Sequence, residues 1–270
     1  MKRIAHISDL HFGTEDPRIA AGLAADLAAI SPNLLVVSGD LTQRAKEAEF
    51  RAAREFLDRI AAPRLVVPGN HDIPFYRVFE RFLSPLRGYR HWIDEAVDPF
   101  FVDDETAVVG INTARSNTWK EGRVSAEQVQ LIAERFAGAP ATSHKILVAH
   151  HPFIPPLYHP DAAVVGRVEE TLRTLERTGC GLILSGHLHR AASGDVRAHH
   201  LQITRSILAI QAGTSISQRT RGEANAYNHL RLEGDLLELE VRTWNGDVFD
   251  SVGLQTFRHG PHGWESKSPR

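Results

Sequence analysis

The sequence predicts an α/β fold built around a parallel sheet. Short apolar runs alternate with longer segments of helical periodicity over residues 4–67, in the order strand, helix, strand, helix, strand. The run at residues 34–38 is continuously apolar, which is typical of a strand buried on both faces. The chain has 270 residues, of which 42% are apolar, so it is long enough to bury a large core and too apolar to be disordered.

The first part of the chain contains five expected elements. They are a strand at residues 4–8, a helix at 17–30, a strand at 34–38, a helix at 45–61 and a strand at 65–67. The first helix is rich in Ala and Leu and begins after Asp16, a residue type suited to cap it. Because helices that join consecutive strands favour parallel pairing, we expect these three strands to lie parallel.

The rest of the chain continues this alternation less regularly. We expect a helix at 75–83 followed by a loop, strands at 107–112, 145–149, 181–185 and 206–211, helices at 125–136 and 166–178, and a hairpin from 227–232 and 236–243. Ser125 and Gln128 form a capping box for one helix, and Gly179 is expected to end another. The pattern fades from residue 253, which predicts one domain at 1–257 and a loose tail at 258–270.

Composition and charge exclude several classes of protein. Lys and Arg number 31 against 33 Asp and Glu, so no global basic field exists and no stable nucleic-acid partner is expected. The single Cys180 excludes an intramolecular disulfide framework and a cysteine-based zinc site. The sequence shows no signal-like segment and no apolar run near the ~20 residues of a membrane span, which predicts a cytoplasmic protein.

Metal-ligand residue types follow five of the expected strands. The carboxyl ends of parallel strands meet at one edge of a sheet, so these side chains should share one crevice. Imidazole, carboxylate and amide groups without a thiolate suit Mn, Fe, Zn or Co. The candidate ligands are Asp9, His11, Asp40, Asn70, His150, His187 and His189. If one carboxylate is shared, two ions receive about four ligands each, an arrangement suited to displacement at phosphorus.

The sequence blocks that carry these residues resemble the calcineurin-like metallophosphoesterase superfamily. In order, they are Asp9-x-His11, Gly39-Asp40, Gly69-Asn70-His71-Asp72, His150 and Gly186-His187-x-His189. The segment His-Ile-Ser-Asp-Leu-His-Phe-Gly and the His-His-Pro turn at His150 are similar to the corresponding segments of the cyclic-nucleotide phosphodiesterase branch. The resemblance implies a four-layer α/β/β/α sandwich with two central mixed sheets and a metal site at the carboxyl ends of the strands.

The resemblance also implies how the ligands divide between two metal ions. One ion is expected on Asp9, His11, Asp40 and His189, and the other on Asp40, Asn70, His150 and His187, with Asp40 bridging. The sequence departs from the protein-phosphatase branch, whose Gly-Asp-x-x-Asp-Arg-Gly block is here Gly39-Asp40-Leu41-Thr42-Gln43-Arg44-Ala45. It also has Ser-Asp-Leu-His at the position where proteins of the nuclease branch carry a block similar to Ser-Asp-Trp-His. Both departures disfavour those substrates.

Four residues are candidates for contacts with a substrate. His71 is expected to donate a proton to the leaving oxygen or to stabilise charge, with Asn70 beside it. Neighbouring side chains on an extended chain point in opposite directions, so His150 is taken as the ligand and His151 as a substrate contact or a neighbour of the metals. Arg115 follows another strand, and either reaches the substrate phosphate or belongs to a solvated loop.

Two other basic stretches have open roles. Arg219 and Arg221 suit a phosphate, but a surface charge pair is the favoured interpretation. Thr214 is expected to form a hydrogen bond near the metals. The segment 76–92 is basic and aromatic, so it suits a lid over the site, although helical support of the body is favoured. Its basic residues are Arg77, Arg81, Arg87, Arg90 and His91.

These inferences predict a metal-dependent phosphoric diester hydrolase. It is expected to hold two divalent or trivalent metal ions per chain, Mn or Fe with Zn and Co as alternatives, and to use a metal-bridging hydroxide. The expected partner is a small phosphodiester substrate, and the branch resemblance favours a 3′,5′-cyclic nucleotide. A phosphomonoesterase, a nuclease, a lipid-linked pyrophosphatase and a non-catalytic metal-binding scaffold stay open, as does assembly into a homo-oligomer.

Overall fold

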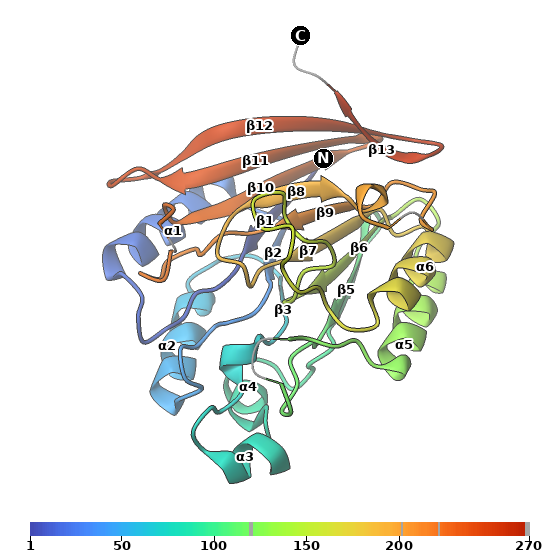
Figure 1. The fold of residues 1–270 in the computed structure, drawn as a ribbon. Helices are drawn as coiled ribbons and strands as arrows, with labels where there is room; N and C mark the ends of the chain where they lie inside the picture. Colours follow the sequence, from blue (N-terminus) through green and yellow to red (C-terminus); the bar gives the residue numbers. More distant parts are fainter. Residues whose placement is uncertain (119–120, 201, 221, 268–270) are drawn as a thin grey trace.

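A computed structural model describes residues 1–118, 121–200, 202–220 and 222–267, which form a mixed α/β fold with two mixed sheets (Figure 1). This confirms the expected fold class. One sheet has the order β13-β12-β11-β10-β1-β2-β3. Its strands are β1 (Lys2–Ile7), β2 (Leu34–Val37), β3 (Arg64–Val66), β10 (Ala226–Glu233), β11 (Leu236–Trp244), β12 (Phe249–Gly260) and β13 (Gly263–Lys267). As expected, β1, β2 and β3 pair parallel, whereas β10 to β13 pair antiparallel.

The second sheet has the order β4-β5-β6-β7-β9-β8. Its strands are β4 (Phe100–Val102), β5 (Thr106–Ile111), β6 (His144–Ala149), β7 (Leu182–Ser185), β8 (Ala192–Asp195) and β9 (Leu208–Gln211). The four central strands are parallel, and the two edge strands, β4 and β8, are antiparallel to their neighbours. The parallel strands of both sheets therefore supply the loops in which the candidate ligands lie.

Helices pack beside both sheets (Figure 1). The helices are α1 (Pro17–Ile30), α2 (Glu47–Asp58), α3 (Val78–Leu83), α4 (Arg87–Trp92), α5 (Ala126–Ala137) and α6 (Val168–Thr178), with short 3₁₀ turns η1 (Asn70–Asp72) and η2 (Val196–Ala198). One buried cluster joins α1 and α2 to the first sheet, and another joins α5 and α6 to the second. A third cluster, which includes Ile4, Val36, Val148 and Leu184, joins the two sheets.

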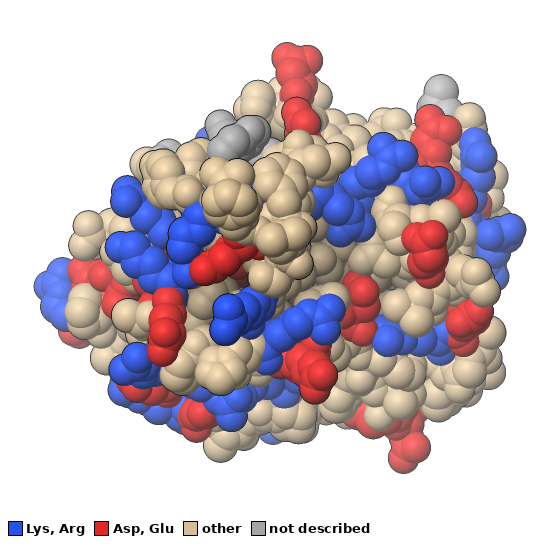
Figure 2. Space-filling view, turned by 90° about the horizontal axis from the view of Figure 1, so that it is seen from below, with Lys and Arg blue, Asp and Glu red and all other residues tan. Residues whose placement is uncertain are grey.

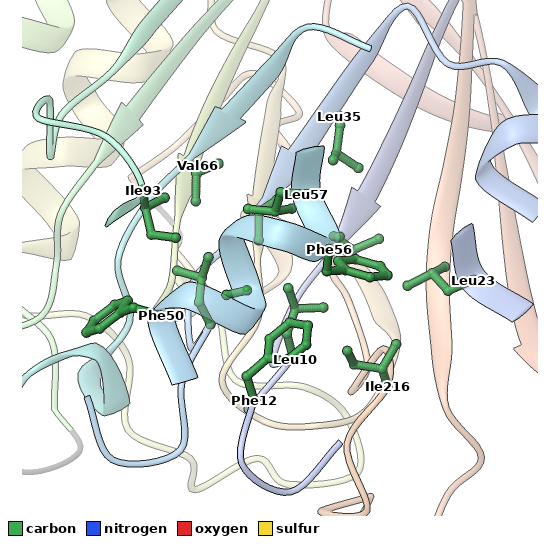
Figure 3. Close-up of a cluster of buried hydrophobic side chains, with 14 of the residues drawn as sticks. Leu10, Phe12, Leu23, Leu35, Phe50, Phe56, Leu57, Val66, Ile93 and Ile216 are labelled. Atoms are coloured by element: carbon green, nitrogen blue, oxygen red, sulfur yellow. The ribbon is translucent and has the colours of Figure 1, made fainter. Parts of the chain in front are cut away.

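The cluster around α2 anchors the loop that follows β1 (Figure 3). Leu10 and Phe12 are buried in the same cluster as Phe50 and Phe56 of α2, and the ring centroids of Phe12 and Phe56 lie 5.8 Å apart. Burying two side chains of this size contributes about 3–6 kcal/mol to folding. Asp9 and His11 alternate with these apolar residues along the loop, so the packing of Leu10 and Phe12 fixes where the polar pair lies.

The structure differs from the predicted elements in three places. Residues 258–267 form the end of β12 and strand β13, where a loose tail was expected. The expected helix at 75–83 begins only at Val78, and the expected loop after it contains α4. The edge strands β4 and β8 were not expected. In contrast, the structure shows the expected capping box of Ser125 and Gln128, and Gly179 ends α6 in a left-handed conformation.

No helix in the described ranges is both long and apolar enough to cross a membrane.

Candidate metal centre

The seven candidate ligands, which lie far apart in the sequence, meet at the carboxyl ends of five parallel strands. Asp9 and His11 follow β1, Asp40 follows β2 and Asn70 opens η1 after β3. From the other sheet, His150 follows β6, while His187 and His189 follow β7. Groups of their ligand atoms lie within 4.8 Å of one another. The site therefore lies where the two sheets meet.

One cluster is formed by Asp9, His11 and His189. Asp9 Oδ1 lies 3.7 Å from His11 Nε2 and 3.7 Å from His189 Nε2. The other carboxylate oxygen, Oδ2, accepts hydrogen bonds from Ser8 Oγ at 2.6 Å and from the His187 amide at 3.0 Å. Oδ1 of Asp9 has no hydrogen-bond partner among the described residues, nor has either ring nitrogen of the fully buried His11.

A second cluster surrounds His150 Nε2. This atom lies 3.4 Å from Asp40 Oδ1, 3.1 Å from Asn70 Oδ1 and 3.2 Å from His187 Nδ1. The Nδ1 atom of His150 lies 2.8 Å from the carbonyl oxygen of Ser38, which can only accept, so Nδ1 carries the proton. In the neutral ring Nε2 then carries no proton, and its lone pair faces the acceptor atoms of Asp40, Asn70 and His187.

Asp40 joins the two clusters. Its Oδ1 lies beside His150 as described, and its Oδ2 lies 3.6 Å from His11 Nε2 in the first cluster. The carboxylate is 1% exposed, and Oδ1 also accepts the His71 amide at 2.9 Å. A shared carboxylate between two groups of ligand atoms is the arrangement that the sequence resemblance implies.

A hydrogen-bond relay fixes the orientation of His189. The Thr214 hydroxyl donates to the carbonyl oxygen of Arg219 at 3.2 Å, since a carbonyl can only accept. The same hydroxyl oxygen lies 2.7 Å from His189 Nδ1, so it accepts the Nδ1 proton. This leaves the Nε2 lone pair of His189 directed toward Asp9, as a metal ligand requires.

The electrostatics of the clusters favour a cation. Burial lowers the pKa of His150, but the Asp40 carboxylate outweighs this effect and raises that pKa to about 9. Burial opposes the charge on Asp9 as well, yet the surrounding histidines, His189 foremost, hold the pKa of its carboxyl below its usual value. Burial and the nearby His150 lower the pKa of His187 to about 3, so that ring is neutral and able to ligate. The two buried carboxylates thus favour positive charge at this site, which explains the raised pKa of His150 and suits a metal ion.

The backbone of the ligand loops is strained. Asp9, His11, Asp40, His187 and His189 all have φ between +46° and +75°, the left-handed region that non-glycine residues avoid. Each such residue costs about 1–2 kcal/mol. Because this strain is concentrated at the ligands, it marks the loops as shaped for a site.

Two glycines allow the close approach of backbone to the carboxylates. A Cβ atom on Gly69 would lie 2.2 Å from Asp40 Oδ1, and a Cβ on Gly186 would lie 1.9 Å from Ser8 Oγ and 2.6 Å from Asp9 Oδ2. Neither position accepts a side chain without displacing a ligand. This gives a physical reason for glycine directly before Asn70 and His187.

These observations fit metal ions. Ligand atoms bound to one ion at ~2.1 Å lie about 3.4 Å apart in a tetrahedral site, close to the separations found in both clusters. Buried carboxylate and imidazole groups without partners are costly unless a cation compensates them. The geometry therefore suits metal ions on both sides of Asp40.

His71 lies at the edge of the centre. Its Nδ1 lies 2.9 Å from the carbonyl oxygen of Gln43 and therefore donates to it, while Nε2 lies 3.2 Å from Arg219 Nη1 and accepts from it. Burial is the main effect that lowers the pKa of His71. The neighbouring Asp72 braces the ligand loops, because its carboxylate accepts the amides of Leu41, Thr42 and Gly69.

Of the other candidate residues, His151 lies near the centre, as expected of a neighbour of the metals, and Arg115 does not contact the ligands. His151 lies beside the second cluster, with its ring centroid 4.7 Å from that of His187 and its Nδ1 2.8 Å from Thr113 Oγ1. The Arg115 guanidinium donates to the carbonyl oxygens of Asn112 and Ala114, both at 2.9 Å, and to Gln128 Oε1 at 2.8 Å. These bonds tie the loop after β5 to α5, so Arg115 has a structural role there.

The sequence favoured a surface charge pair for Arg219 and Arg221, but Arg219 contacts His71. Arg221 lies outside the described residues. Gln43, which contacts both His71 and Arg219, was not anticipated. Its position in the Gly39-Asp40 block was the available signal.

The segment 76–92 supports the body at one end and projects at the other. Tyr89 of α4 is fully buried and donates its hydroxyl to the Val66 carbonyl oxygen at 2.8 Å. In α3, Phe79 and Leu83 are 85% and 82% exposed. Together with α2, the segment lines a solvent-open pocket of about 840 Å³, with Phe50, Arg77, Arg87 and Trp92 among its lining residues.

Comparisons with known proteins agree with this geometry. The family model for calcineurin-like phosphoesterases matches residues 2–191. A cAMP/cGMP dual specificity phosphodiesterase of Mycobacterium tuberculosis (strain CDC 1551 / Oshkosh) is 27% identical over 243 residues, 83% of this chain and 73% of that protein. A glycerophosphodiester phosphodiesterase of Enterobacter lignolyticus (strain SCF1) is 30% identical over 144 residues, 45% of this chain and 51% of that protein.

Solved structures show the same fold. A purple acid phosphatase of yellow lupin superposes with a TM-score of 0.66 at 13% identity and covers 93% of this chain, which spans 53% of the lupin protein. A dimetal phosphatase of Danio rerio superposes with a TM-score of 0.63 at 14% identity. The superposition covers 90% of this chain and 96% of the Danio rerio chain. The family model covers well over half of the sequence and confirms the resemblance that the motif blocks suggested. The chain belongs to the calcineurin-like phosphoesterase family, a family of hydrolases.

Proposed function

We propose that this protein is a phosphodiesterase that uses two metal ions per chain to hydrolyse a small phosphodiester. The observation that carries the proposal is the pair of ligand clusters that share the buried Asp40 carboxylate. One ion would be held by Asp9, His11, Asp40 and His189, and the other by Asp40, Asn70, His150 and His187. Imidazole with oxygen ligands suits Mn or Fe, and also Zn or Co.

The ligand residues provide a charge balance suited to phosphate chemistry. When bound, two such ions supply positive charge to the phosphoryl oxygens and make hydroxide available near neutral pH. Asp9 and Asp40 contribute two negative charges in a site with little solvent. The five neutral ligands leave the rest of the metal charge for an anionic substrate. Ser38, Thr214 and the His187 amide hold the ligands in place without adding charge.

His71 is proposed to act on the leaving oxygen. Its ring is oriented by the Nδ1 donation to Gln43, which leaves Nε2 on the side of Arg219. In the neutral ring Nε2 is an acceptor, so donation of a proton from this atom requires that Arg219 first turns away from it and that Nε2 is protonated. A role in general acid catalysis and a role in positioning charge are therefore distinguishable by the leaving group, as discussed below.

A 3′,5′-cyclic nucleotide is the substrate we favour. Relatives with that activity in their names support it, including the M. tuberculosis enzyme and a 3′,5′-cyclic adenosine monophosphate phosphodiesterase of Escherichia coli (strain K12), 27% identical over 164 residues. Figure 2 shows basic and acidic side chains interspersed over the face on the side of α3 and α4. Mixed charge of this kind favours a small diester over a long polyanion.

The test is a comparison of substrates with metal-loaded protein. We expect kcat/KM for bis(4-nitrophenyl) phosphate to exceed that for 4-nitrophenyl phosphate. We also expect the protein to hydrolyse cyclic AMP, and chelation to abolish all three activities. A preference for the monoester of about tenfold or more would reassign the enzyme as a phosphatase. Full metal loading without turnover of any ester would instead favour a binding scaffold.

A further inference from the structure

Arg219 places a positive charge beside the candidate metal centre, and no carboxylate in the described ranges pairs with it. Its Nη1 donates to His71 Nε2 and to Gln43 Oε1, both at 3.2 Å. Both acceptors are neutral. Within the described part of the chain, Arg219 forms no ion pair, and its Nε and Nη2 groups have no hydrogen-bond partner. This side of the guanidinium is therefore available to a ligand.

The loop that carries Arg219 is held in place by the same relay that orients a metal ligand. The Arg219 carbonyl oxygen accepts from Thr214, which also contacts His189. The Arg219 amide donates to Ser217 Oγ at 3.2 Å, and Asn225 Nδ2 donates to the carbonyl oxygens of Thr214 and Ser217 at 3.3 and 2.8 Å. The backbone of Arg219 is thus fixed relative to His189, so its side chain starts from a defined position at the rim.

A second arginine provides a contrast at the same rim. Arg190 follows the ligand His189 directly, but it pairs with Glu223 and lies over the ring of Tyr158, 4.3 Å from its centroid. Its charge is therefore already compensated. Arg219 has no such compensation from the residues that the structure describes, and a half-buried guanidinium beside neutral acceptors gains most from an anion that accepts two parallel hydrogen bonds.

We propose that Arg219 is a substrate-binding residue that donates to a phosphoryl oxygen of the phosphodiester. This inference rests on the proposed phosphodiesterase function and identifies a contact outside the seven metal ligands. The phosphate accepts from the free Nε and Nη2 side of the guanidinium. Gln43 Oε1 still accepts from Nη1, whereas phosphate binding draws the guanidinium away from His71 Nε2, as protonation of that ring requires. A phosphate oxygen has the charge and the geometry for this fork, and no carboxylate among the described residues pairs with Arg219 and competes with it.

The experiment measures phosphate binding and turnover in metal-loaded Arg219→Ala and Arg219→Lys, with Arg190→Ala as the matched control. For Arg219→Ala we expect kcat/KM for bis(4-nitrophenyl) phosphate to fall, and the inhibition constant of inorganic phosphate to rise, by about 10- to 100-fold, the loss of a charged hydrogen bond. Arg219→Lys should recover part of both losses. Arg190→Ala should stay within about threefold of wild type, as a compensated surface charge does.

The outcomes separate this inference from the proposed function. If wild type hydrolyses no diester, the proposed function fails, and the affinity for inorganic phosphate measured by calorimetry still decides the role of Arg219. The inference is overturned if Arg219→Ala matches wild type in phosphate affinity, or if Arg190→Ala loses as much. A loss of bound metal in Arg219→Ala would also overturn it, because that result assigns Arg219 to the support of the metal centre.

Discussion

Replacement of Thr214 by Val should weaken metal binding without disturbing the fold. Thr214 is 1% exposed, and its hydroxyl accepts the Nδ1 proton of His189 at 2.7 Å. Valine has nearly the same shape but leaves this proton buried without an acceptor, at a cost of about 1–3 kcal/mol. That free energy corresponds to about 5- to 150-fold in affinity, in line with the 10- to 100-fold effect of other groups that orient metal-ligating histidines.

The assay is a calorimetric titration of metal-stripped protein with Mn²⁺ near neutral pH, with Thr214→Ser as the matched control. Serine keeps the hydroxyl and loses only the methyl group, so it should bind Mn²⁺ like wild type. Thermal unfolding without metal checks that the fold of each variant is intact. Equal Mn²⁺ affinity in Thr214→Val and wild type, or an equal loss in Thr214→Ser, would refute the argument from the hydrogen-bond relay.

Three further predictions concern other parts of the molecule. His71→Ala should keep its metals and lose about 10²–10⁴-fold in kcat on a diester with a poor leaving group, and much less with nitrophenolate; equal losses would contradict proton donation. Asp26→Asn removes the negative charge and one of the two oxygens that accept from the Tyr227 hydroxyl at 2.5 Å and from two Arg242 donors at 2.7 Å. It should lower the free energy of unfolding by about 2–3 kcal/mol in chemical denaturation, less than for a fully buried pair because Glu240 still pairs with Arg242; an unchanged value would contradict this. Burial raises the pKa of Cys180 to about 12, so a thiol reagent at pH 8 should label it only after unfolding, and rapid labelling of the native protein would show the opposite.

The positions of the ligands were predictable because residue type and strand order carry the same information. Asp9, Asp40 and Asn70 each follow an apolar run, and parallel strands bring such positions to one edge. The bridging position of Asp40 came from the family resemblance, and the structure places its two oxygens toward different clusters. The left-handed backbone of the ligands was not predictable, since Asp and His adopt this region more often than most residues but still only rarely.

The parts of the fold that were not predicted lack a hydrophobic pattern. Strand β12 is exposed at most of its positions, so its sequence has no alternation of apolar and polar residues. Helix α4 is six residues long and buries only Tyr89, which is too little for helical periodicity to appear. The contact between Arg219 and His71 joins residues 148 positions apart, and only the folded chain reveals it.

The metal content of the protein distinguishes a centre of two ions from a centre of one. Wild-type protein equilibrated with Mn²⁺ and freed of excess metal should contain two ions per chain by elemental analysis, the number expected for clusters that share one carboxylate. Asp40→Ala, which removes the shared ligand, should lose both ions and nearly all hydrolysis of bis(4-nitrophenyl) phosphate. A saturating value of one ion per chain in wild-type protein with full activity would contradict the two-metal centre.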